Sequence, residues 1–528
     1  MISRRLLLVG ATSGAALVAA GCTTRPEPDL SRLPPNEHRV VTRPVAADLV
    51  VAPGPEGAVA ASRALFAAAT AVVVIGALEA SEASGATDAT PAPDETARAE
   101  APDSPAPGAT ASAPVPATHL IAARVATALG VPFFLWTPDL AAELDRLQTR
   151  TVVAYAADGL DLGAREVIAG PAEATDLSLP GLPATPPAAT ALAFSHGELA
   201  APTTATLAAA GLRPMELRWP HPGIDLTSTA FVRANGLPVV AVGEGFGDDQ
   251  QFAAQVRATR TAPELPGGGI VPFPGRRMIA LYGHPQTPLL GMMGEQSPAK
   301  AVERVRRLVA EYQPLLSGET VMGAFEIIAT VASGAAGDDG DYSNETAIDV
   351  LLPWIEAAEA ADVYVVLDMQ PGRTDFVTQA KRYEELLRRP HVGLALDPEW
   401  RLRPDGRHLV SIGQVGVDEV NEVGAWLADL VQTHDLPPKV LILHQFQTRM
   451  ITERHRLDTT RPEVQHLVHV DGQGSQGAKQ ATWAAITRDL PERTWLGWKN
   501  FEDEDQPMLT PAQTVAQVHP TPDFISYQ

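Results

Sequence analysis

Several residue types are scarce in this chain of 528 residues, and each shortage excludes a class of structure. Cys22 is the only cysteine, so the chain has no internal disulfide and no cysteine-based metal site. Aromatic residues make up only 5% of the chain, but 45% is hydrophobic, so aliphatic side chains must build the cores. The formal net charge of -23 argues against nucleic acid or anionic lipid as the main partner.

Long apolar runs are also scarce, and the clearest one lies at the N-terminus. Leu6 to Ala20 follows Arg4 and Arg5, and it is too short for a settled transmembrane helix. It ends in Ala19-Ala20-Gly21-Cys22, which resembles a bacterial lipobox in which Ala19 replaces the usual Leu. Ser3-Arg4-Arg5-Leu6-Leu7-Leu8 also resembles a twin-arginine export signal. We expect residues 1–22 to be a lipoprotein signal peptide and 23–37 a tether. Cys22 would carry the lipid and hold the protein on the extracytoplasmic face of the cell membrane.

Residues 38–270 alternate short apolar runs with helical patterns, which predicts an α/β domain with a mainly parallel sheet. Residues 80–117 interrupt the alternation with Ala, Pro, Thr, Ser, Asp and Glu, so a disordered insertion is predicted there. The expected strands are Ala47–Ala52, Ala71–Ile75, Pro132–Trp136, Thr151–Ala156, Met215–Trp219 and Pro238–Gly243, and the expected helices are Ala58–Ala69, Thr118–Leu129, Leu140–Gln148 and Asp249–Thr259.

Two segments of this region carry a resemblance. They are Ser62-Arg63-Ala64-Leu65-Phe66 followed by Ala71–Gly76, and Ala122–Pro132. Together they resemble the type 2 cell-wall-binding repeats of bacterial surface proteins. No glycine-rich phosphate-binding motif follows the first strand, because Gly54-Pro-Glu-Gly57 has the wrong spacing. We therefore expect a structural or wall-associating domain without a nucleotide.

Residues 271–528 contain eight strand-like runs separated by helical patterns, which predicts a (β/α)8 TIM barrel. The expected strands are Met278–Gly283, Val321–Ile327, Val363–Leu367, Val392–Leu396, Val440–Leu443, Leu467–Val470, Trp495–Trp498 and Phe524–Tyr527. The expected helices are Ala299–Tyr312, Ala347–Ala361, Asp375–Arg389, Val417–Thr433 and Gly477–Arg488.

Polar residues follow the strands of this predicted barrel at the end where such barrels hold their chemistry. In the fourth strand, Asp397 and Glu399 are two residues apart and share a side, while branched apolar residues take the other side. The full set is His284, Glu326, Asp368, Asp397 with Glu399, His444 with Gln447, Asp471, Lys499, and Tyr527 with Gln528. Because buried charges are costly unless paired or used, we expect these side chains to meet in one pocket.

Asp397-Pro-Glu399 resembles the strand-four motif of the glycoside hydrolase class of barrels, although Gly393 and Ala395 replace the earlier Asp residues of the chitinase signature. Leu-Asp-Pro-Glu-Trp, Leu-His-Gln-Phe and His-Val-Asp-Gly-Gln-Gly also resemble an actinobacterial-type family of surface lipoproteins. The first resemblance implies a glycoside hydrolase, and because the tether would hold it at the cell envelope, we expect its substrate to be a cell-wall or envelope polysaccharide. Glu399 would be the general acid, Asp397 would orient it, and Asp368 or Asp471 would be the second carboxylate. The residues expected to bind substrate are His284, Glu326, Trp400, His444, Gln447, Trp498 and Lys499.

Two alternatives remain open from the sequence. The first is a metal-dependent hydrolase of a phosphodiester or amide, with ligands among His284, Glu326, Asp368, Asp397, His444 and Asp471. No His-x-His stands on strand one and Lys499 would repel a cation, so we expect neither a metal nor another cofactor. The second alternative is a barrel that binds wall glycan without cleaving it.

Overall fold

The computed structural model describes residues 28, 30, 32–76, 116–156, 158–408 and 412–528. The predicted signal peptide with Cys22, and the predicted insertion apart from residues 116 and 117, lie outside the described residues. The described part of the predicted tether lies against the N-terminal region, since Leu30 is buried and Arg150 donates a hydrogen bond of 3.0 Å to the Leu33 carbonyl. Among the described helices, none has the length and apolar character that crossing a membrane requires.

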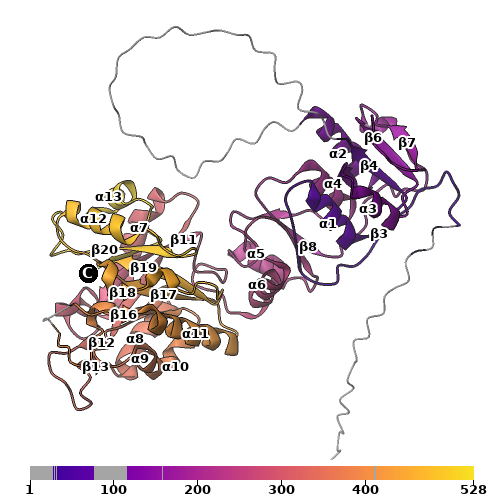
Figure 1. Ribbon diagram of the computed structural model, residues 1–528. Helices are drawn as coiled ribbons and strands as arrows, with labels where there is room; N and C mark the ends of the chain where they lie inside the picture. The colour runs from indigo at the N-terminus through magenta and orange to yellow at the C-terminus, as the bar shows by residue number, and fades with distance from the viewer. Residues whose placement is uncertain (1–27, 29, 31, 77–115, 157, 409–411) are drawn as a thin grey trace, which may run out of the picture.

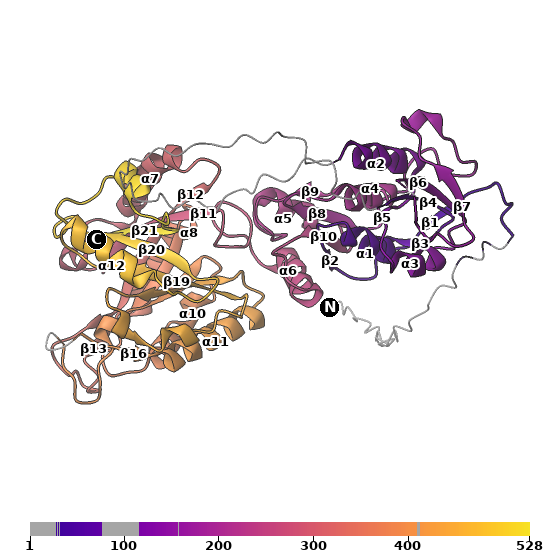
Figure 2. The same cartoon turned by 45° about the horizontal axis from the view of Figure 1, so that its top comes forward.

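The N-terminal region is α/β with parallel strands, as predicted, but the strands form two sheets (Figures 1 and 2). One four-stranded sheet has the order β2-β10-β8-β9 and the other β5-β4-β6-β7, while β1 and β3 form an antiparallel pair. The strands are β1 (Val40–Thr42), β2 (Leu49–Val51), β3 (Phe66–Ala69), β4 (Ala71–Ile75), β5 (Phe133–Leu135), β6 (Thr151–Tyr155), β7 (Glu166–Ala169), β8 (Leu192–His196), β9 (Met215–Glu216) and β10 (Val239–Gly243). The helices are α1 (Glu56–Leu65), α2 (Ala117–Leu129), α3 (Leu140–Arg146), α4 (Ala201–Ala209), α5 (Leu226–Arg233) and α6 (Asp249–Thr261).

One predicted helix of this region is wrong at its C-terminal end. The pattern predicts a helix over Ala58–Ala69, but α1 ends at Leu65 and the next four residues form strand β3. Three of those four residues are alanines, which favour a helix by themselves. Pairing with β1 decides the outcome, because it provides hydrogen-bond partners for their backbone groups.

The C-terminal region is a closed barrel of eight parallel strands, as predicted. Its sheet runs β11-β21-β20-β19-β17-β15-β14-β12, with β13 added to β12, and pairing of β11 with β12 closes it. The strands are β11 (Arg276–Gly283), β12 (Thr320–Ala332), β13 (Ser343–Glu345), β14 (Tyr364–Met369), β15 (Val392–Leu396), β17 (Lys439–His444), β19 (Val464–Val470), β20 (Trp495–Asn500) and β21 (Phe524–Tyr527), with a small outer pair β16 (Val415–Gly416) and β18 (Ile451–Thr452). The outer helices are α7 (Pro298–Tyr312), α8 (Ile348–Glu359), α9 (Phe376–Arg382), α10 (Glu384–Leu387), α11 (Val417–Thr433), α12 (Gln476–Ile486) and α13 (Pro511–Gln517).

The barrel strands divide their side chains by parity between two apolar clusters. Alternate residues such as Ala324, Val366 and Ile442 belong to the interior cluster, and their neighbours belong to the large cluster beneath the helices. Leu265 and Phe273, which precede the first barrel strand, also belong to the interior cluster. The segment before the barrel therefore contributes to its floor.

Strand β15 is unusually small on its inward side because it faces a tyrosine. A side-chain carbon at Gly393 would lie 2.9 Å from the Tyr364 hydroxyl and 2.8 Å from the Val440 carbonyl oxygen. Both contacts are too close for carbon, so glycine leaves the room that Tyr364 fills inside the barrel.

We predict opposite effects for two glycine-to-alanine substitutions in the barrel. Gly393→Ala should lower the free energy of unfolding by about 1–3 kcal/mol, because the added methyl group overpacks the interior. Gly477→Ala should raise it by up to about 1 kcal/mol, since Gly477 is helical and nothing lies within 4 Å of the added carbon. Denaturant unfolding followed by tryptophan fluorescence measures both values. Equal effects of the two substitutions would contradict this account of β15.

Candidate active site

A polar layer lies above the apolar interior at the carboxyl ends of the barrel strands. Tyr282, Glu326 and Asp368 continue the inward parity of β11, β12 and β14, and each is buried. Asp397, His444, His469, Asp471 and Lys499 supply the layer from β15, β17, β19 and β20. We call these eight residues the mouth cluster.

His444 is the centre of the mouth cluster. Its Nε2 donates to Glu326 Oε1 at 2.8 Å and its Nδ1 donates to Asp471 Oδ2 at 3.0 Å. Two carboxylate acceptors call for a proton on each ring nitrogen, which makes the ring an imidazolium. Burial alone lowers the pKa of His444, but Glu326 and Asp471 outweigh burial and hold that pKa well above its usual value.

His469 lies beside this pair, from the neighbouring strand. Its ring centroid is 4.7 Å from that of His444, and its Nδ1 is 3.5 Å from Glu326 Oε1. Its Nε2 forms a 2.9 Å hydrogen bond with the Ser526 hydroxyl. Burial lowers the pKa of His469, so it contributes a neutral ring next to the charged one.

Asp368 is the acid on the opposite side of His444. Its Oδ2 accepts a hydrogen bond of 2.9 Å from the Tyr282 hydroxyl, and its Oδ1 lies 4.0 Å from His444 Nε2 without a hydrogen bond. Burial raises the pKa of Asp368 to about 6. Burial also raises the pKa of Tyr282 well above its usual value, so the phenol stays a donor.

Asp397 and Glu399 form the rim above this buried layer. Asp397 Oδ1 accepts a hydrogen bond of 3.1 Å from the Glu399 backbone N–H and begins the 3-10 turn Pro398–Trp400. Asp397 is buried, whereas the side chain of Glu399 is partly exposed. Burial raises the pKa of Asp397 well above its usual value, and burial together with the charge of Asp471 raises the pKa of Glu399 to about 7.

Asp471 differs from the other acids. Burial favours its neutral form, but the hydrogen bond and charge of His444, followed by the charge of Lys499, outweigh burial and lower its pKa. Lys499 Nζ lies 3.4 Å from the centroid of the Tyr282 ring. The mouth therefore holds an acid that is readily protonated, Glu399, close to an ionised one, Asp471.

Four residues expected to bind substrate have other surroundings. His284 Nε2 is bonded to the Thr346 hydroxyl at 3.0 Å, and Gln447 Oε1 accepts from Arg449 at 2.7 Å. Trp400 is partly exposed beside Glu399, with its ring 5.3 Å from that of His408. Trp498 points away from the mouth and packs against Trp483 of α12, so the expectation that it faces substrate is wrong.

Three members of this network are absent from the residues predicted from the sequence. They are Tyr282, His469 and Ser526, although each shares the inward parity of its strand. The predicted residue of the first strand is His284 and that of the last is Tyr527, whose hydroxyl is hydrogen-bonded to the Tyr312 hydroxyl of α7 at 2.7 Å. Parity counted from the strand interior, rather than from the last polar residue, would have found all three.

Three members of the mouth cluster have the chemistry of a metal site. Ligand atoms of Glu326, His444 and His469 lie within 4.8 Å of one another, and all three residues are fully buried. The ring nitrogens that face away from this group, His444 Nδ1 and His469 Nε2, form hydrogen bonds with Asp471 and Ser526. Metal-binding histidines usually have such a hydrogen-bond partner on their second nitrogen. In the present arrangement the inward-facing nitrogen of His444, Nε2, is hydrogen-bonded to Glu326.

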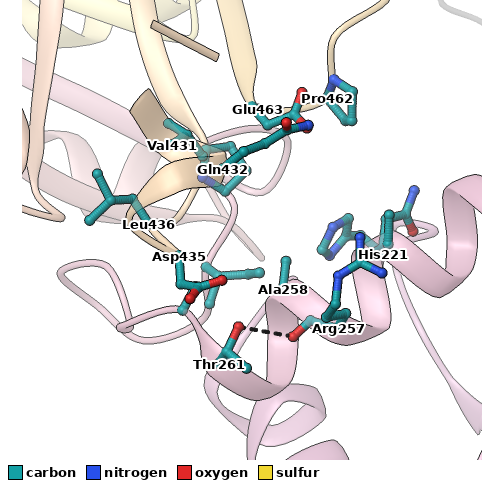
Figure 3. Close-up of a pocket in the computed structure, with 15 residues that line it drawn as sticks. His221, Arg257, Ala258, Thr261, Val431, Gln432, Asp435, Leu436, Pro462 and Glu463 are labelled. Carbon is teal, nitrogen blue, oxygen red and sulfur yellow. Dashed lines mark hydrogen bonds between the residues drawn. The ribbon is translucent and has the colours of Figure 1, made fainter. Parts of the chain in front are cut away.

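Figure 3 shows a cavity of about 330 Å³ that lies away from this cluster. It lies between helix α6, with Arg257 and Thr261, and the segments that lead into β17 and β19, with Asp435 and Glu463. These segments enter the barrel strands from their amino ends, so the cavity is at the opposite end from the mouth cluster. It brings together no comparable set of buried acids and histidines.

Searches of known protein families and of curated proteins find no match to this chain. The side-chain chemistry of the barrel mouth is therefore what supports a function.

Proposed function

We propose that the barrel is a hydrolase of a cell-wall or envelope polysaccharide that works by carboxylate acid/base catalysis. The observation that carries the proposal is a pair of neighbouring acids with opposed pKa shifts at the rim of the mouth. The pKa of Glu399 is raised to about 7, and that of Asp471 is lowered. Two carboxyl groups whose pKa values are shifted in opposite directions provide an acid and a base for glycosidic bond cleavage.

In this mechanism Glu399 protonates the oxygen of the leaving sugar. Its raised pKa keeps a proton available near neutral pH, and its partial exposure lets substrate reach it. Asp397 is a positioning residue, because its carboxylate fixes the backbone turn that carries Glu399. Asp397 is also neutral-leaning, so it adds little negative charge beside the acid.

Asp471 is the ionised partner, either as nucleophile or as the base that activates water. His444 fixes one of its oxygens at 3.0 Å, while the other oxygen is buried and has no hydrogen-bond partner among the described residues, so it is the oxygen that we assign to the reaction. Asp368, also a candidate from the sequence, is fully buried and bonded to Tyr282, so we assign it to support of the network.

We predict that Glu399→Gln lowers kcat on the cleaved glycan by about 10²–10⁴-fold while binding is retained, because the shape stays and the proton is lost. In the wild type, activity should fall as pH rises through about 7, since the acid must be protonated to act. That fall should be absent from the residual activity of the variant. A screen of envelope glycans by product release, followed by a pH profile, measures these effects.

Glu502→Gln is the matched control, because Glu502 is an exposed acid in the segment after β20 that pairs with Arg304. It should keep wild-type turnover and pH profile. Equal turnover of Glu399→Gln and wild type would remove Glu399 from the mechanism. Binding without turnover of every glycan by the wild type would favour the non-catalytic wall-binding alternative.

A second candidate function is metal-dependent hydrolysis, which the grouping of Glu326, His444 and His469 favours. Against it, the hydrogen bonds of His444 to two carboxylates favour a proton on Nε2, the His444 nitrogen that a metal in this group would need. We predict that the purified protein carries no stoichiometric zinc, manganese or iron, and that a chelator leaves its activity unchanged. Elemental analysis tests the first point, and a stoichiometric ion lost together with activity in His469→Ala would reverse the order of the two functions.

The proposed substrate depends on the proposed location of the protein at the cell membrane. A lipidated Cys22 would hold the barrel at the outer face of the membrane, where envelope glycan is the abundant polymer. We predict that Cys22→Ala moves the protein from the membrane fraction to the soluble fraction, as fractionation and immunoblotting would show. A variant that stays as firmly bound as wild type would refute the lipid anchor.

A further inference from the structure

We propose that a pocket in the loops after β15 and β17, at the mouth end of the barrel, binds an anionic group of the substrate, a phosphate or a carboxylate, so that the polymer cleaved is acidic. This inference deepens the proposed function and depends on it. The pocket has a volume of about 460 Å³ and is lined by four arginines and one acid. They are Arg401, Arg403, Arg407, Arg449 and Asp405.

Two of the four guanidinium groups have no partner within the described part of the chain. Arg403 and Arg407 are exposed and make no hydrogen bond or ion pair there. Arg449 donates only to the neutral amide of Gln447, at 2.7 Å. Arg401 is different, because Glu419 pairs with it at 2.9 Å and it also donates to two backbone carbonyls.

The charge of this pocket opposes that of the whole protein. With Arg401 offset by Glu419, three arginines face one aspartate in a chain whose net charge is -23. Cations gathered around one hollow repel one another unless an anion lies between them, and the planar guanidinium matches the paired oxygens of phosphate and carboxylate. A neutral sugar can accept hydrogen bonds from these arginines, but it carries no charge to offset theirs.

The loop that lines the pocket adjoins the turn that carries Glu399. The Gly413 N–H, in the pocket lining, donates to the Glu399 carbonyl at 2.7 Å, and Arg401 follows the turn that carries Glu399. Gly413 also has no room for a side chain, because an added carbon would lie 2.5 Å from that same carbonyl. One chain can therefore present a sugar to Glu399 and an acidic substituent to the arginines.

An acidic substrate also needs such a site for electrostatic reasons. Glu326, Asp368 and Asp397 are buried inside the mouth and Asp471 lies beside them, partly buried, so an anionic polymer would be repelled from these carboxyl groups. The arginines lie outside that buried layer, on exposed loops, where they attract the polymer and fix its register before a neutral part of it enters the mouth.

Isothermal titration calorimetry on the full chain tests this proposal with three probes. They are tripolyphosphate, trigalacturonate and the neutral maltotriose. We expect one or both acidic probes to bind and maltotriose not to. The double variant Arg403→Ala/Arg407→Ala should weaken binding by about tenfold or more, the loss expected for charge-assisted hydrogen bonds. Because neither side chain has a partner among the described residues, near-ultraviolet circular dichroism should stay unchanged.

Arg388→Ala is the matched control, since Arg388 is an exposed arginine directly after α10 that pairs with Glu384 and does not line the pocket. It should leave affinity unchanged. The tighter of the two acidic probes identifies the substituent as phosphate or carboxylate. The proposal is overturned if neither acidic probe binds, or if the double variant and Arg388→Ala have the same affinity as wild type. Glu399→Gln should keep full affinity, so loss of turnover there and loss of binding in the double variant report on separate claims.

Discussion

The barrel mouth depends on the contact of one buried imidazolium with two carboxylates. His444 joins Glu326 of β12 to Asp471, which follows β19, and so connects strands on opposite parts of the barrel. Without its charge, the largely buried carboxylates of Glu326 and Asp471 would lose the group that offsets their charge, and an unpaired buried ion costs several kcal/mol. The His444 ring therefore helps to decide which acids stay ionised and which are protonated more readily.

This division of charge explains how five acids are tolerated so close together. Glu326 and Asp471 take the charge of His444, while Asp368 is hydrogen-bonded to the neutral phenol of Tyr282. Asp397 is instead bonded to a backbone N–H. Glu399 and Asp471 are both partly exposed, but of these two acids only Asp471 accepts a hydrogen bond from a side chain of the described residues. The acid whose protonation changes near neutral pH, Glu399, therefore lies where a ligand can reach it.

Much of the barrel could be predicted from the sequence, because a strand buried on both faces leaves a strong pattern. β15 and β21 have the predicted bounds, and all eight predicted strands are present. The failures are places where partners distant in sequence decide. The short Phe66–Ala69 forms a strand only because β1 pairs with it. Trp498 looked like a mouth residue from its position near a strand end, but the parity of β20 turns it toward α12. The pairing of His444 with two acids depends on the closed barrel, which no local pattern encodes.

The floor of the barrel has a consequence for where the two halves of the chain can be separated. Leu265 and Phe273 lie among the interior side chains, and Gln465 of β19 both accepts from the Phe273 N–H at 2.8 Å and donates to its carbonyl. A fragment that began at the first barrel strand would lose these two plugs and expose the lower ends of its neighbours in the interior. The connecting segment therefore belongs to the barrel, and a domain boundary that keeps the barrel interior intact lies upstream of Leu265.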